Sequence, residues 1–102
     1  MLRVLLLENT DPEELGMLPH FLDENDKRPA REQFHDNYQH GGGWSPIDGF
    51  TMTKDCKLSY PGDPLFEPIA MLLFNDELVL FYKYGLVAIK QRDGTFEVAR
   101  MD

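Results

Sequence analysis

The segment of residues 40–50 carries the residue types that ordinary folding explains least: a histidine, three consecutive glycines and the only tryptophan. Because glycine has no side chain, its backbone N–H group is accessible to a ligand. Glycine also loses more conformational entropy on folding than any other residue. A large aromatic side chain directly after them is typical of a contact surface, because tryptophan is enriched at interface hot spots. We therefore interpret this part of the chain as a candidate binding surface made of Tyr38, His40, Gly42, Gly43, Trp44, Ile47 and Phe50.

The residues His40-Gly41-Gly42-Gly43 resemble the HGGG motif of lipases and esterases, in which glycine N–H groups stabilise an oxyanion. The resemblance ends there, since the chain contains no G-x-S-x-G sequence and is, at 102 residues, too short for an α/β-hydrolase. Gly41 has a simpler role as the left-handed residue that ends a helix. An alternative for Trp44, Ile47 and Phe50 is that they plug one end of a sheet.

Histidines, the cysteine and the carboxylates form no recognisable metal or catalytic pattern. His35 and His40 are five residues apart, which places them about 140° apart around a helix, so they cannot chelate one ion. Cys56 is the only cysteine, and no internal disulfide is possible. The acidic pairs, such as Asp76 and Glu77, are tied to no apolar pocket and are predicted to face solvent. We assign no catalytic residue, no metal ligand and no cofactor.

One helix is predicted over residues 29–40. Pro29 suits the first helical turn, where its missing N–H is not needed. The polar residues, Gln33 included, are predicted to face away from the core. Apolar residues recur every four positions and form one stripe: Ala30, Phe34 and Tyr38.

The remaining segments are predicted to be β-strands. Residues 2–7 read as a short buried strand, and residues 50–53 and 57–60 as a small hairpin. An alternative places a short helix at residues 64–74, against which Pro68 argues. Two further hairpins turn at Asn75-Asp76 and Asp93-Gly94, and their strands are predicted at residues 69–74, 78–83, 86–92 and 95–101.

The last hairpin has a predicted register. A two-residue loop at Asp93-Gly94 places Lys90 opposite Glu97 on the solvent face and Ile89 opposite Val98 on the inner face. The predicted fold class is α+β, a single domain over residues 1–102. It is an antiparallel meander of about four strands, with an N-terminal strand, a small hairpin and the helix packed on one face.

Composition limits the classes of partner. The formal net charge of −8 repels phosphate backbones and anionic membranes, so we expect no direct nucleic-acid or membrane binding. The apolar run of residues 4–7 is too short for a signal peptide, and no stretch approaches a membrane span. The single cysteine fits a reducing compartment, and the predicted location is the cytoplasm.

These features favour a non-enzymatic protein-binding or regulatory accessory protein, which acts on a protein partner or as a homo-oligomer. The contact is expected at the candidate binding surface or at an exposed strand edge, Thr95 to Met101. One alternative is a small-molecule binder or small enzyme with a site around the loop Gly41–Phe50. Another is an inhibitor that imitates nucleic acid with the acidic residues 8–26. Small size and acidic charge are also compatible with an accessory protein of a phage or mobile element.

Overall fold

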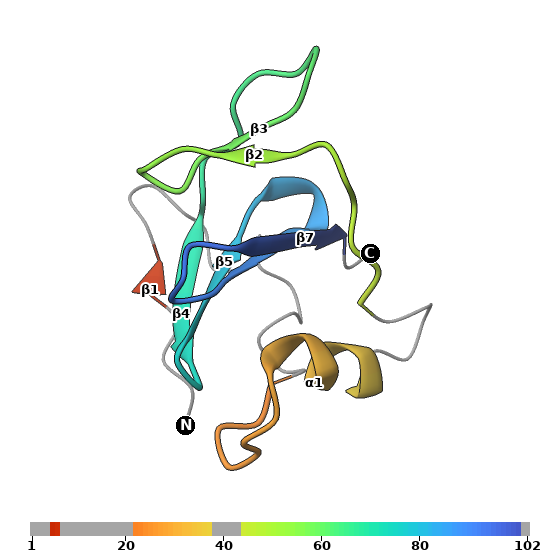
Figure 1. Cartoon of the computed structure of the whole chain (residues 1–102), viewed down its shortest axis with the longest axis vertical. Helices are drawn as coiled ribbons and strands as arrows, with labels where there is room; N and C mark the ends of the chain where they lie inside the picture. Colours follow the sequence, from red (N-terminus) through yellow and green to blue (C-terminus); the bar gives the residue numbers. More distant parts are fainter. Residues whose placement is uncertain (1–4, 7–21, 38–43, 101–102) are drawn as a thin grey trace.

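The computed structural model describes residues 5–6, 22–37 and 44–100, which form a five-stranded antiparallel sheet, a two-stranded hairpin and an α-helix (Figure 1). The strand order in the sheet is β1-β4-β5-β6-β7. The last four strands form a meander in chain order, and the N-terminal strand pairs antiparallel with β4. The predicted α+β class, the meander and the added N-terminal strand are therefore confirmed.

Every element is short. The helix α1 is Ala30–Asn37, so the prediction over residues 29–40 is confirmed in its described part. Because residues 70–74 are a strand, the alternative helix at residues 64–74 is wrong. The strands are β1 Leu5–Leu6, β2 Thr51–Met52, β3 Leu58–Ser59, β4 Ala70–Phe74, β5 Glu77–Phe81, β6 Leu86–Lys90 and β7 Phe96–Arg100.

Turn residues set the connections between the strands. Asn75 and Asp76 join β4 to β5 with φ angles of 48° and 67°, the left-handed pair that a two-residue type I′ turn requires. Asn and Asp adopt this conformation more readily than most residues. Lys83–Gly85 form a short 3-10 turn, η3, between β5 and β6. The predicted turn at Asn75-Asp76 is thus confirmed.

The predicted register of the last hairpin is wrong by one residue. Lys90 lies opposite Phe96, and Ile89 lies opposite Glu97. The connection is a three-residue loop, because the N–H of Gln91 donates to the carbonyl of Thr95 at 2.8 Å. Such loops combine a type I turn with a left-handed residue, here Gly94 with a φ of 91°. A one-residue shift exchanges the two faces of a strand, so Glu97 faces the helix instead of solvent.

The sheet has a hydrophobic cluster on each face. Figure 1 shows α1 on one side of the sheet and the β2–β3 hairpin on the other. On the helix side, Phe34 and Trp44 belong to one cluster with Val79, Phe81 and Val87. On the hairpin side, Leu58 belongs to a second cluster with Leu80, Tyr82, Leu86, Ala88 and Val98. Both faces of the central strand β5 are therefore covered, as its sequence predicts.

The loop before α1 is held in place by two side-chain amides. Gln33 is fully buried, which corrects the prediction that it faces away from the core. Its Oε1 accepts from the N–H of Asp23 at 2.8 Å, and its Nε2 donates to the carbonyls of Asp26 and Arg28. The Nδ2 of Asn75 donates to the same two carbonyls. These bonds tie the loop to both the helix and the β4–β5 turn.

Candidate functional site

The described part of the candidate binding surface divides between core and surface. Trp44 is 9% exposed and stacks on Phe34, with ring centroids 5.6 Å apart and planes inclined by 25°. Ile47 is exposed and Phe50 is half-buried against the hairpin-side cluster. Tyr38, His40, Gly42 and Gly43 lie outside the described residues. Contact with a partner through this surface stays a prediction, whereas Trp44 packs in the hydrophobic core.

The Trp44 segment also covers part of the sheet edge. Pro46 forms an antiparallel bridge with Ala99, and the N–H of Ile47 donates to the carbonyl of Val98 at 2.7 Å. This contact occupies the middle of the predicted free edge, Thr95 to Met101, whose last residue lies outside the described part of the chain. Pairing of this edge with another chain stays a prediction, and a partner would first have to replace this bridge.

A polar chain links the Trp44 segment to α1 through β7. The indole Nε1 of Trp44 donates to Oε2 of Glu97 at 3.0 Å, and Nη1 of Arg31 contacts Oε1 of the same carboxylate at 3.2 Å. The one-residue register shift makes this arrangement possible, because it places Glu97 on the helix face. A buried indole N–H requires such a partner.

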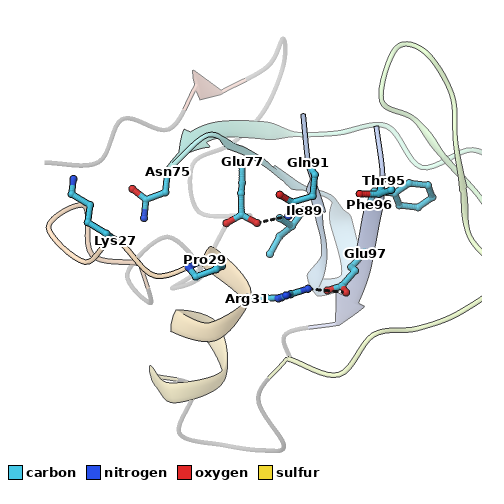
Figure 2. A pocket seen from close by; sticks show the side chains of 10 residues that line it. All are labelled: Lys27, Pro29, Arg31, Asn75, Glu77, Ile89, Gln91, Thr95, Phe96 and Glu97. Carbon is cyan, nitrogen blue, oxygen red and sulfur yellow. Dashed lines mark hydrogen bonds and ion pairs between the residues drawn. The ribbon is translucent and has the colours of Figure 1, made fainter. Parts of the chain in front are cut away.

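A cavity of about 460 Å³ lies between the N-terminal end of α1 and the adjoining ends of β5, β6 and β7 (Figure 2). We call it the α1 cavity. Its volume falls in the range of ligand pockets. The pair Arg31–Glu97 lies across one wall, and the side chains of Glu77 and Gln91 lie together on the opposite wall. The remaining lining residues are Lys27, Pro29, Asn75, Ile89, Thr95 and Phe96.

Glu77 is a site residue, and the prediction that it faces solvent is wrong. It is only 5% exposed. Its Oε1 accepts from the N–H of Ala30 at 2.8 Å, and its Oε2 accepts from Nε2 of Gln91 at 2.5 Å. The carboxylate thus caps the first turn of α1, where a negative charge complements the helix dipole. A signal was present in the sequence, since Glu77 alternates in phase with the buried Val79 and Phe81.

Beside the cavity, the loop before α1 carries an exposed ion-pair network. The guanidinium of Arg28 bonds both Asp26 and Asp36. Hydrogen bonds from the side chain and the backbone N–H of Arg28 lower the pKa of Asp26 below its usual value. This part of the predicted acidic segment 8–26 is therefore already paired with a cation. Residues 8–21 lie outside the described chain, and nucleic-acid mimicry stays a prediction.

A second hollow, of about 260 Å³, lies near the β4–β5 turn at the end of the sheet. Leu73 and Leu78 are cross-strand partners there. Leu73 is 75% exposed. We call this area the Leu73 surface, and it consists of Leu73, Asp76, Leu78, Lys90, Gln91 and Arg92.

We compared the chain with known protein families, curated proteins and solved structures. No family model, no curated protein and no solved structure matches the chain. Among the described residues, no three His, Cys, Asp or Glu side chains gather where they could hold a metal ion. No helix in the same residues is long and apolar enough to cross a membrane.

Proposed function

We propose that the chain is a non-enzymatic protein-binding protein, and that the Leu73 surface contacts the partner. The observation that carries the proposal is the 75% exposure of Leu73 within a regular strand of the sheet. A single exposed leucine is common on protein surfaces. Here, however, it adjoins the half-buried Leu78 in a hollow, and neighbouring apolar side chains within a polar rim are typical of the place where a partner's side chain docks.

The charges around the hollow indicate the chemistry of the partner. Lys90 forms no ion pair with another described residue, and Arg92 pairs only with the exposed Asp76, at 3.1 Å. These two cations adjoin Leu73 in a chain whose net charge is −8. In a partner segment with an apolar side chain flanked by carboxylates, the apolar side chain would pack on Leu73 and Leu78, and a carboxylate would pair with Lys90. We therefore propose that the partner presents a protein segment in which an apolar side chain is flanked by carboxylates.

The test places a photo-crosslinking amino acid at position 73, with the same substitution at Leu65 as the control. Leu65 is an exposed leucine, 53% accessible, that does not line the Leu73 surface. We expect a discrete crosslinked partner from position 73 only, in the cells that naturally produce the chain. Equal products from both positions would contradict the proposal. A crosslink to a second copy of this chain alone would also contradict it, since self-association would then explain the surface.

Purified components complete the test. Leu73→Asp and the double variant Lys90→Glu with Arg92→Glu should each weaken binding of the captured partner by roughly tenfold, about 1.4 kcal/mol. Leu65→Asp should leave the affinity unchanged. Titration calorimetry measures all three. If Leu73→Asp binds as tightly as the parent chain, the Leu73 surface is not the contact.

A second function, the binding of a small ligand, is supported by a separate observation. The α1 cavity is preformed, is large enough for a small molecule and has a buried carboxylate in its wall. It differs from the predicted site around the loop Gly41–Phe50, because the lining residues come from α1, the preceding loop and the ends of the strands.

A further inference from the structure

Glu77 combines deep burial with neutral partners. Its two described donors are the backbone N–H of Ala30 and the side-chain amide of Gln91, and neither carries a formal charge. The only cation shown on the opposite wall of the α1 cavity, Arg31, is paired with Glu97 at 3.2 Å. Buried carboxylates are normally matched by a cation as well as by hydrogen bonds. Lys27, the other cation that lines the cavity, lies apart from Glu77 in Figure 2, and no described side chain forms an ion pair with this carboxylate.

Gln91 presents a second acceptor beside this carboxylate. Its Nε2 must be the atom that faces Glu77, because a carboxylate accepts and does not donate. The amide oxygen of Gln91 therefore lies on the other side of the amide, and no described residue donates to it. Figure 2 shows the carboxylate and the amide close together above Ile89, on the wall that faces the helix. The Glu77 carboxylate and the Gln91 amide oxygen are two acceptors beside the apolar side chain of Ile89. This arrangement is complementary to a ligand with N–H donors at the end of an alkyl chain.

We propose that the α1 cavity binds a primary alkylammonium group. Its N–H donors contact the carboxylate of Glu77 and the amide oxygen of Gln91, and its alkyl stem lies against Ile89 and Pro29. The charge of the ammonium provides the match that Glu77 lacks within the described structure. The net charge of −8 raises the local concentration of small cations around the molecule. This proposal rests on the second proposed function, ligand binding in the α1 cavity, and does not depend on the Leu73 surface.

The test is a titration of the full chain with n-butylammonium, followed by two-dimensional amide NMR. We expect saturable shifts at Ala30, Glu77, Ile89 and Gln91. Tetramethylammonium is the control probe, since it has the same charge and no N–H donor, and it should produce no saturable shift at these residues. A lack of saturation with n-butylammonium, or equal shifts with both probes, would overturn the proposal. A third probe, lysine amide acetylated at its α-nitrogen, keeps the side-chain ammonium. Saturable shifts at the same residues with this probe would indicate a lysine side chain as the source of the ammonium group, and shifts with n-butylammonium alone would indicate a free amine.

Three variants locate the site. Glu77→Gln keeps an acceptor for the N–H of Ala30 but removes the charge, so we expect at least a roughly tenfold loss of affinity. Glu67→Gln is the matched control, because it removes the same charge from an exposed residue that pairs with Lys57 in the region of the β2–β3 hairpin. Equal affinities for the two variants would contradict the proposal.

The third variant guards against a folding defect in Glu77→Gln. Arg31→Gln removes the cation on the opposite wall from a half-exposed side chain, and the helix tolerates the change. It should bind n-butylammonium more tightly than the parent chain, since the repulsion between two cations disappears. Unchanged or weaker binding in Arg31→Gln would count against an ammonium site in this cavity.

Discussion

The indole of Trp44 and the carboxylate of Glu97 lie 53 residues apart in sequence and share a part-buried hydrogen bond. Arg31 contacts the second oxygen of the same carboxylate from the helix. One charged side chain thus satisfies the buried N–H of an aromatic residue and connects three segments of the chain. Loss of an acceptor from a buried donor costs more than the hydrogen bond contributes, because the donor stays desolvated.

The first prediction concerns Glu97. Glu97→Ala should lower the free energy of unfolding by roughly 1–3 kcal/mol, because the indole N–H of Trp44 loses its acceptor. Glu97→Gln should cost less, since an amide oxygen still accepts that bond and the exposed pair with Arg31 contributes only about 0–1 kcal/mol. Urea unfolding, followed by the fluorescence of the single tryptophan, measures both. Equal losses for the two variants would show that the ion pair, and not the indole bond, is the important contact.

Single residues were the hardest part of this molecule to predict from the sequence. Gln33 and Glu77 look like surface residues because both are polar, yet both are buried. Each is explained by a partner distant in sequence or in a loop: Glu77 bonds Ala30, 47 residues away, and Gln33 bonds the loop before α1. Local patterns of polarity do not contain that information, and the α1 cavity was missed for the same reason.

At the scale of elements, local chemistry was more informative. Ala30 and Phe34 have helical spacing and are both buried, and Asn75-Asp76 forms the predicted turn. The failure at Asp93-Gly94 has a physical cause, since this dipeptide suits both a two-residue and a three-residue loop. Asp93 favours the longer one, because its Oδ1 accepts from the N–H of Thr95 at 3.0 Å and from the Thr95 hydroxyl at 2.6 Å.

The second prediction concerns that loop. Gly94→Ala should lower the free energy of unfolding by roughly 1–2 kcal/mol, the cost of placing an alanine in the left-handed region. The φ of Gly94 is 91°, and a Cβ there would meet no atom within 4 Å, so the loss would be purely conformational. Gly94→Asn should cost less, because asparagine tolerates positive φ. Chemical denaturation compares the variants, and equal stability of Gly94→Ala and the parent chain would refute the expectation.

In the described part of the chain, the five-stranded sheet lies between two unequal layers. The helix and the Trp44 segment cover one face, and the small hairpin covers the other. Tyr82 links the sheet to this hairpin, because its hydroxyl donates to the carbonyl of Cys56 at 2.5 Å. Burial, with an electrostatic contribution from Cys56, raises the pKa of Tyr82 above its ordinary value of 10.0. The folded molecule therefore favours the neutral phenol.

The third prediction is the alkaline limit of stability. As pH rises through 10.0, the unfolded chain ionises Tyr82 before the folded chain does. The contribution of Tyr82 is thus complete below that pH and declines above it, by up to about 1.4 kcal/mol per pH unit. Tyr82→Phe should remove this part of the slope, although it also loses the bond to Cys56 at neutral pH. Denaturation curves at neutral and alkaline pH, compared between the two chains, measure the difference, and parallel pH profiles would contradict it.

The three-residue loop before β7 also has a consequence for how this chain can diverge. An odd change in the length of this loop moves every side chain of the following strand to the other face of the sheet, whereas an even change does not. Phe96 and Val98 would then replace Glu97 and Ala99 beneath the helix, and the acceptor for Trp44 would be lost. Homologues that keep the tryptophan and the glutamate should therefore change this loop by an even number of residues, and a search for distant relatives can use that rule as a filter.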